Sequence, residues 1–377
     1  MLALQTPPRG GTAVPTPIRI CFIVTTSIDD PIRLDAIAEC ARGPAVPLST
    51  AELAFAVRHG LAPQLYRNAP GLRPALEERF QQNLRRSLVL TSELLRLLDA
   101  LPPALAFKGP ALAQRLYGDF AGREYCDLDL VFRPADVLPA ILALRRIGYS
   151  GLGLDPWQLR SHLRNGCEYP MSDDRVHVEL HWQFAPRQFG ALFDIDKLFA
   201  RSCNIRISER DVPALSPEDD FLMLVVHGTK HAWARLAWVA DLAALLRRSQ
   251  LDWDYIRSEA RRMRMMRMVR VALVLSGWMG APLPDAMRHE IAHDPQALTV
   301  AGHMKDYIAQ LNQPGLEDRA EHRLVAATLD SAADRLAYAA RYAITPTIAD
   351  WSFLRLPRGL RWLYPAVRLL RLATQKT

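Results

Sequence analysis

Hydrophobic residues change their spacing along the chain, and the changes divide it into stretches of different structure. Residues 49–101 carry apolar side chains at helical spacing, with Ser49 and Thr50 as candidate N-caps. Short apolar runs bounded by glycine or proline follow, interrupted by helical segments. The pattern becomes helical again after about residue 201, where Ser216 and Pro217 predict the start of a long helix. Helices are therefore expected on both sides of a short mixed region.

The mixed region alternates three predicted strands with two predicted helices. The strands are expected in 104–109, 126–132 and 173–184, and the helices in 110–118 and 134–147. The sequence thus predicts an α+β chain with a small mixed-sheet domain flanked by N- and C-terminal helical regions. Its expected parts are a loose segment at 1–48, a helical region at 49–101, an α/β domain at 102–200 and a helical domain with a basic tail at 201–377.

Composition narrows the class of protein. The 377 residues are 50% hydrophobic, and the formal net charge of +7 favours anionic partners such as nucleotides. Five scattered cysteines without a Cys-x-x-Cys pair argue against a disulfide framework or a zinc ribbon, so a reducing cytoplasm is expected. The sequence contains no apolar run long enough to span a membrane, no P-loop, no complete dinucleotide fingerprint and no nucleophile elbow.

Two aspartates interrupt the predicted strand "EYCDLDLVF". Asp127 and Asp129 are two residues apart and share one face, so their charges would repel each other if buried alone. A divalent cation removes that cost, and Mg²⁺ prefers oxygen ligands. Glu179 occupies a polar position of the strand "RVHVELHW", whose other face is apolar. Three carboxylates could hold two metal ions that bind an NTP and activate a hydroxyl for attack on phosphorus. Asp-x-Asp alone also occurs in turns, caps and solvated edges.

A second polar feature precedes the aspartates. Lys108 and Gly109 end one strand and open a helix, where backbone N–H groups and the helix dipole favour phosphate. Arg123 could reach a phosphate or pair with an aspartate. Alone, Lys108-Gly109 is more typical of a simple strand-to-helix turn.

The segment "FKGPALAQRLYGDFAGREYCDLDLVF", together with the later "VELHW" and "HGTKHAWARLAWVADLAALL", resembles a bacterial family of uncharacterised nucleotidyltransferases with the DNA-polymerase-β-like fold. The resemblance covers the chain from about Ser49 onward. It implies Mg²⁺ (or Mn²⁺) ligands and catalytic groups at Asp127, Asp129 and Glu179, and nucleotide contacts at Lys108 and Gly109. Pro110 follows where better-known nucleotidyltransferases have serine.

The implied reaction moves an NMP from an NTP, ATP first, to a hydroxyl or phosphate of a small molecule, glycan or peptide natural product. Pyrophosphate is released, and a biosynthetic protein or peptide is an expected partner. The alternative is a non-catalytic protein of the same fold that binds nucleotide or a partner, as in a biosynthetic or antitoxin-like complex. Metal-dependent turnover separates the two.

Other polar clusters carry weaker signals. His227 and His231 share a helix face and could bind zinc or, with His181, contact substrate, although a structural role is more typical. Residues 351–377 contain arginines and aromatic residues but no acidic residue, which fits a basic helix docked on the body or, second, contact with a membrane surface. Nucleic acid is not an expected partner.

Overall fold

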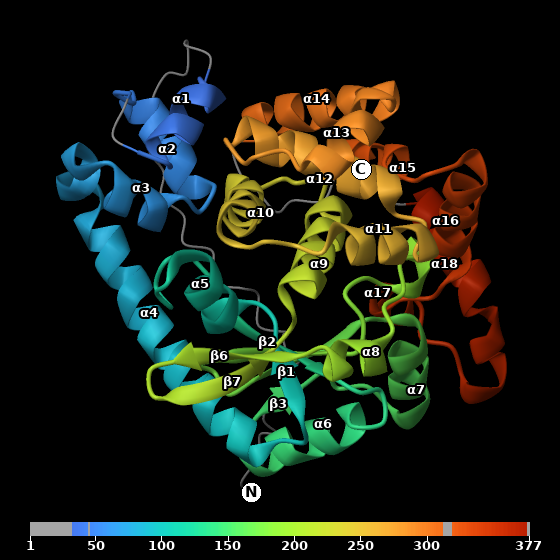
Figure 1. Cartoon of the computed structure of the whole chain (residues 1–377). Helices are drawn as coiled ribbons and strands as arrows, with labels where there is room; N and C mark the ends of the chain where they lie inside the picture. The colour runs from blue at the N-terminus through green and yellow to red at the C-terminus, as the bar shows by residue number, and fades with distance from the viewer. Residues whose placement is uncertain (1–31, 44–45, 312–318, 375–377) are drawn as a thin grey trace, which may run out of the picture. The chain divides into compact units, whose positions relative to one another are not determined.

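A seven-stranded mixed sheet lies at the centre of the computed structural model, which describes residues 32–43, 46–311 and 319–374 (Figure 1). The strands, in spatial order, are β3 (Ser150–Gly151), β4 (Glu168–Ser172), β5 (His177–His181), β2 (Asp127–Phe132), β1 (Ala104–Ala106), β7 (Arg210–Ala214) and β6 (Cys203–Ile207). Strand β2 pairs parallel to β5 and antiparallel to β1, so it is hydrogen-bonded along both edges.

Helices surround the sheet and make up most of the described chain. In the N-terminal half they are α1 (Leu34–Cys40), α2 (Thr50–Arg58), α3 (Ala62–Asn68), η1 (Pro70–Leu72), α4 (Arg73–Ala100), α5 (Gly109–Tyr117), α6 (Val137–Arg146), α7 (Pro156–Asn165), η2 (Arg187–Phe189) and α8 (Ile195–Ala200). The remainder are α9 (Pro217–Lys230), α10 (Leu236–Arg248), α11 (Trp253–Arg262), α12 (Met266–Trp278), α13 (Asp285–Ala292), α14 (Pro295–Gln310), α15 (Arg319–Ala327), α16 (Ala332–Ile344), α17 (Ile348–Phe353), η3 (Arg358–Leu363) and α18 (Tyr364–Thr374). No helix among the described residues is long and apolar enough to cross a membrane.

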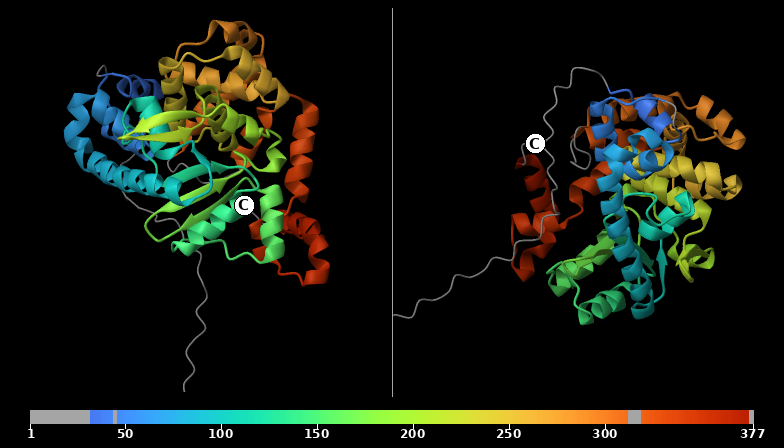
Figure 2. Two further views of the ribbon diagram at one scale, coloured as in Figure 1. Left: turned by 60° about the horizontal axis from the view of Figure 1, so that its bottom comes forward. Right: turned by 90° about the vertical axis from the view of Figure 1, so that its left-hand side faces the viewer.

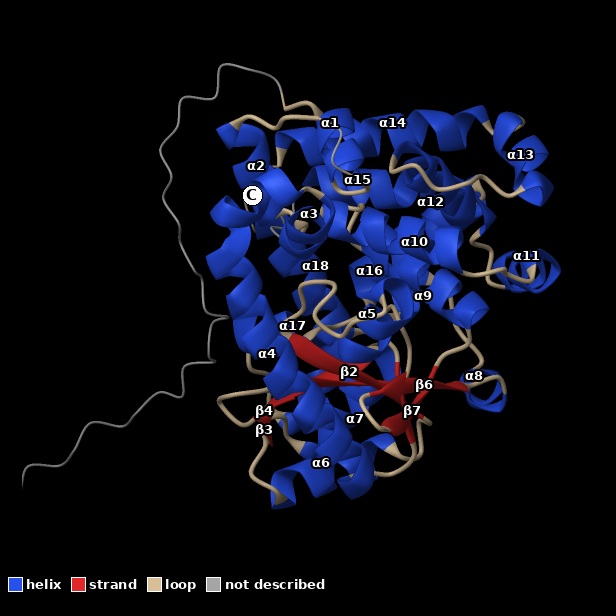
Figure 3. Cartoon of the chain, turned by 60° about the vertical axis from the view of Figure 1, so that its left-hand side comes forward, coloured by secondary structure: helices blue, strands red, loops and turns tan. Residues whose placement is uncertain are grey.

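The two faces of the sheet belong to different hydrophobic cores. Helix α6 lies on one face, while α9 and α10 lie on the other (Figure 3). On the α6 side, Leu128 and Leu130 of β2 pack with the inward residues of α6. On the opposite side, Val131 joins the larger core that α9, α10 and α12 build. Because side chains alternate along a strand, the aspartates of β2 lie on the same face as Val131, which is the face covered by α9 and α10.

The predicted α+β architecture is confirmed, with helical regions before and after the sheet. Ser49 caps α2 through a capping box with Glu52, and the Ser216 side chain accepts a hydrogen bond from the Asp219 backbone at the start of α9. Both ends follow from the capping chemistry visible in the sequence. Strands β3, β4, β6 and β7 were not expected, because each is short and lacks a strong apolar run.

The N-terminal segment differs from its expectation over part of its length. Residues 34–40 form α1 inside the stretch 1–48 that the sequence suggests is loose, because this helix buries apolar residues such as Leu34 and Ile37 in the larger core. Residues 1–31 lie outside the described residues. Residues 32–377 belong to one compact unit, and the expected division at residues 101 and 200 stays a prediction.

Candidate active site

Two neighbouring parallel strands bring the carboxylates together. In the register of β2 and β5, Asp129 pairs with Glu179 and Asp127 pairs with His177. Directly paired residues of adjacent strands point to the same face, so Asp129 and Glu179 stand side by side. His181, two residues after Glu179, shares that face. The sequence pattern predicted which face of each strand is polar. Because β2 and β5 are neighbours in the sheet, these two polar faces lie side by side.

Asp129 is the centre of a compact polar cluster. The Lys108 ammonium donates a hydrogen bond to Asp129 Oδ1 at 2.8 Å. The Nε2 atom of His181 lies 3.1 Å from the same oxygen and 3.2 Å from Glu179 Oε2. Asp129 and His181 are buried, whereas the side chain of Glu179 remains 28% exposed. A small molecule can therefore reach the cluster from the Glu179 side.

The pKa values of the two aspartates are shifted in opposite directions. Burial and the nearby charges of Asp129 and Glu179 raise the pKa of Asp127 to about 7. Burial also opposes ionisation of Asp129, but Lys108 and His181 outweigh it and hold the pKa of Asp129 below its ordinary value. For His181, hydrogen bonding to Asp129 and Glu179 overcomes burial and raises its pKa to about 9. The like charges are thus only partly compensated by protein cations.

The cluster has the donor set that a divalent cation needs. One ligand atom from each of Asp129, Glu179 and His181 lies within 4.8 Å of the others. Asp129 Oδ2 is buried and has no hydrogen-bond partner among the described residues, which is costly for a carboxylate oxygen. A cation would satisfy that oxygen, and paired carboxylate oxygens suit Mg²⁺ or Mn²⁺. The residues present fit such an ion.

Lys108 and Gly109 form the turn from β1 into α5, behind the carboxylates. Gly109 has φ +52°, and a Cβ atom there would meet the backbone oxygen of Asp127 at 3.4 Å. The left-handed conformation is one that glycine adopts without strain. It lets α5 begin directly behind Asp127 while the Lys108 side chain turns toward Asp129. The turn expected from the sequence is present, and its lysine, Lys108, binds the carboxylate of Asp129.

Replacing Gly109 by alanine is expected to lower the free energy of unfolding by about 1 kcal/mol, since an L-residue is strained at positive φ. Urea unfolding measures the change. Gly302→Ala in the exposed part of α14 is the matched control, because a Cβ there meets no atom within 4 Å. The control should gain about 0.5 kcal/mol from the better helix propensity of alanine. A stable Gly109→Ala protein would contradict the strained turn.

Arg123, in the loop before β2, pairs with an aspartate of helix α10. Its Nε donates to Asp241 Oδ2 of α10 at 2.9 Å, and the Tyr117 hydroxyl donates to Asp241 Oδ1 at 2.8 Å. Arg123 and Asp241 are both buried. The sequence had left open a phosphate or an aspartate as the partner of Arg123. The observed contact ties the loop before β2 to α10.

The turn between α9 and α10 closes the other side of the cluster. Lys230 Nζ lies 3.8 Å from Glu168 Oε2, next to His181. The rings of His227 and His231 lie 5.2 Å apart, and both pack near Trp238. Burial and the neighbouring cations lower the pKa of His231 to about 3 and that of His227 well below its ordinary value. Both shifts favour the neutral imidazole at pH 7, and contact of these histidines with substrate stays a prediction.

A close backbone approach shapes this turn. Trp233 is fully buried and lies against Gly228, where a Cβ atom would come within 2.6 Å of the indole ring. Ala232 and Trp233 both have positive φ, at 46° and 55°. The chain thus turns tightly around the indole ring, directly after Lys230, whose ammonium lies near Glu168.

Sequence reasoning did not single out Glu168. Strand β4 pairs antiparallel with β5, and Glu168 lies directly opposite His181. Its Oε2 is 3.7 Å from His181 Nδ1, and the Lys230 and His181 charges help lower the pKa of Glu168 to about 2. The alternation of Glu168 and Pro170 with buried Tyr169 and Met171 was a signal, but the segment was too short to be recognised as a strand.

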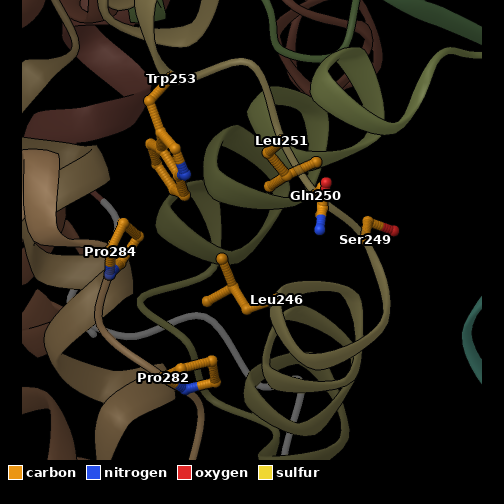
Figure 4. Close-up of a pocket in the computed structure, with 7 residues that line it drawn as sticks. All are labelled: Leu246, Ser249, Gln250, Leu251, Trp253, Pro282 and Pro284. Carbon is orange, nitrogen blue, oxygen red and sulfur yellow. The ribbon is translucent and has the colours of Figure 1, made fainter.

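The structure also contains a hollow whose lining shares no residue with the carboxylate cluster. It occupies the space between the loops that follow α10 and α12 (Figure 4). Its lining consists of Leu246, Ser249, Gln250, Leu251, Trp253, Pro282 and Pro284. None of these side chains titrates, so the hollow has no group for acid–base or metal chemistry.

Comparison with known proteins supports the chemistry suggested by the carboxylates. A family model described as uncharacterised nucleotidyltransferase matches residues 50–280, which is more than half of the chain. The matched segment contains the whole cluster, from Lys108 to Lys230, and the Arg123–Asp241 pair. None of the curated proteins matches the chain.

Proposed function

The chain belongs to this family of uncharacterised nucleotidyltransferases, and we propose that it transfers an NMP from an NTP, ATP first, to an acceptor. The acceptor is a hydroxyl or phosphate on a small molecule, a glycan or a peptide natural product, and pyrophosphate is the second product. The observation that carries the proposal is the pairing of Asp129 with Glu179, with an unsatisfied carboxylate oxygen on Asp129.

Each residue of the cluster has a role in this proposal. We assign Mg²⁺ or Mn²⁺ to Asp129 and Glu179, which with His181 form the compact donor set, and to Asp127 on the same face of β2. The ion would neutralise phosphate charge and activate the acceptor. Lys108 contributes a cation beside Asp129. The start of α5 at Gly109 is the helix N-terminus that we assign to a phosphate, although Pro110 offers no N–H there. We assign to Glu179, whose side chain is partly exposed, the role of taking the proton of the acceptor hydroxyl.

The bond changes are those of an in-line displacement. The acceptor oxygen forms a bond to the α-phosphorus of the NTP, and the bond from that phosphorus to the bridging oxygen of pyrophosphate breaks. The leaving pyrophosphate carries the negative charge away. Lys230 and Arg235, at the α9–α10 turn, are the further cations that we assign to the triphosphate. We also assign His227 and His231, as neutral groups, and His181, which contacts Asp129 and Glu179, to the surroundings of the substrate.

The test is metal-dependent transfer by the purified full chain. Each of the four α-labelled NTPs is incubated with Mg²⁺ or Mn²⁺ and a cell extract as the source of acceptor, and both pyrophosphate and labelled product are measured. Label transfer that requires the metal and disappears in Asp127→Ala/Asp129→Ala is the expected result. Equal nucleotide binding by both proteins, without transfer by either, would instead support the non-catalytic alternative.

A further inference from the structure

The last helix of the described chain, α18, buries arginine side chains and exposes apolar ones, whereas a surface helix usually does the opposite. Its inward face carries Tyr364, Val367 and Arg368, all of them buried. Arg368 and Arg371 donate to the buried Asp350 at 3.3 and 2.5 Å. Its outward face consists of Ala366, Leu369, Leu370 and Ala373, and these four residues are exposed. Charged residues of a surface helix normally lie toward water, so this arrangement leaves an apolar face without a partner.

The neighbouring elements also expose large apolar side chains. Helix α16 packs against α18 and exposes Leu336 and Ile344, while η3 exposes Leu360 and Trp362, whose side chain is 72% accessible. More than half of the exposed large hydrophobic residues in the described chain lie between 336 and 370. Helices α16 to α18 form the red segment along one side of the unit (Figure 2). Apolar residues gathered in this way mark an interaction surface.

The charges beside this surface are positive. Arg355 is exposed between α17 and η3, Arg358 is exposed at the start of η3, and Arg341 is exposed on α16. Asp350 is the only acidic residue from 347 to 377, and it is fully buried by its arginine partners. The exposed large side chains from 355 to 370 are therefore leucines, a tryptophan and arginines. The acidic groups beside them are paired, Asp155 with Arg361 and Asp334 with Arg264.

We propose that this surface, formed by α16, η3 and α18, binds an anionic membrane. Exposed leucines enter the boundary between headgroups and acyl chains, tryptophan prefers that interface, and arginine binds lipid phosphate. The helices lie on the membrane rather than cross it, because α18 has 11 residues. The outward face of α18 carries no acidic side chain, and its one exposed polar residue is Thr374 at the end of the helix. The proposal does not depend on nucleotidyl transfer.

Vesicle flotation with the full chain tests the proposal. The protein is mixed with vesicles of phosphatidylcholine and phosphatidylglycerol and, in parallel, with vesicles of phosphatidylcholine alone. We expect binding to the anionic vesicles, weaker binding to the neutral ones, and a further decrease at high salt. Leu369→Glu/Leu370→Glu should weaken binding by about tenfold or more, because two half-exposed leucines no longer enter the lipid.

Two further variants separate the apolar from the electrostatic contribution. Arg355→Gln/Arg358→Gln should reduce binding to anionic vesicles by about tenfold and leave the weak binding to neutral vesicles unchanged. Leu138→Glu/Leu142→Glu is the matched control, because these two leucines are exposed to a similar degree on α6. The control should bind vesicles as the wild-type protein does.

Three results would overturn the proposal. The first is no binding of the wild-type protein to anionic vesicles, and the second is equal binding by Leu369→Glu/Leu370→Glu. The third is a wild-type dimer that this double variant converts to a monomer in light scattering, which would assign the surface to a second copy of the chain. Metal-dependent label transfer should be the same in wild type and variant, so failure here is distinct from failure of the proposed reaction.

Discussion

Replacing Asp129 by asparagine is expected to reduce metal-dependent transfer about a thousandfold or more. The change removes the carboxylate that pairs with Glu179 and carries the unsatisfied Oδ2, so one ligand of the proposed metal loses its charge. Loss of about 4 kcal/mol of stabilisation in the transition state corresponds to this factor. Label transfer with saturating NTP gives the rate, and the free Mn²⁺ signal in electron paramagnetic resonance gives metal binding.

The effect on the fold should be small, which separates loss of the site from loss of the protein. Asparagine has nearly the shape of aspartate. It removes the negative charge at position 129, which repels Asp127 and helps to raise the pKa of Asp127. Lys108 loses its closest partner in exchange. These effects oppose each other, so the unfolding free energy should change by less than about 2 kcal/mol.

Asp254→Asn is the control for the Asp129 experiment, because that side chain is 95% exposed on α11. It should transfer label and bind Mn²⁺ as the wild type does. Wild-type rates in Asp129→Asn would mean that the buried carboxylate takes no part in the reaction. Unchanged Mn²⁺ binding together with a lost rate would place the metal on other residues.

Replacing Arg123 by methionine is expected to lower the free energy of unfolding by about 3–5 kcal/mol. The guanidinium and Asp241 are both buried, with side chains 8% and 1% exposed, and removal of one partner leaves the other charge unpaired. Guanidinium chloride unfolding at constant pH measures the loss. The double variant Arg123→Met/Asp241→Leu should recover most of it, because two apolar side chains replace the ion pair.

The loss in Arg123→Met should depend on pH in a defined direction. Burial already raises the pKa of Asp241 in the fold, and Arg123 is the cation that lowers it. Without Arg123, the folded pKa rises further above its unfolded value, so the fold gains stability as pH falls and Asp241 takes a proton. The destabilisation should be smaller at about pH 5 than at about pH 8.

Arg210→Met is the matched control for the buried pair. Arg210 pairs with Asp99 at 2.7 Å, but both side chains are largely exposed. Water screens that pair, so its loss should cost less than about 1 kcal/mol. Equal losses in Arg123→Met and Arg210→Met would mean that burial of the Arg123 pair adds nothing to its importance.

Local patterns in the sequence predicted the parts of the site that depend on local geometry. The alternation in β2 placed Asp127 and Asp129 on one face, and the Ser216–Pro217 pair marked the start of α9. What pairs with a strand depends on residues far along the chain. The parallel register of β2 with β5 and the position of Glu168 opposite His181 follow from the sheet order, which no local pattern contains.

The Arg123–Asp241 pair illustrates the same limit for side chains. The two residues are 118 positions apart, and the sequence near Arg123 favoured a phosphate as readily as an aspartate. A lone aspartate in the apolar run "WVADLAALL" was a sign that Asp241 needs a buried partner, but not which one. The loop before β2 brings Arg123 to Asp241 only after the chain has folded.

The position of β2 between β1 and β5 also determines how the site is lost on heating. Amide hydrogens of a strand paired along both edges exchange with solvent mainly when the whole sheet opens. Asp129 and Glu179 stand on two such neighbouring strands rather than on loops that fray at lower temperature. The carboxylate pair therefore persists until cooperative unfolding of the sheet, and thermal inactivation and global unfolding become one event.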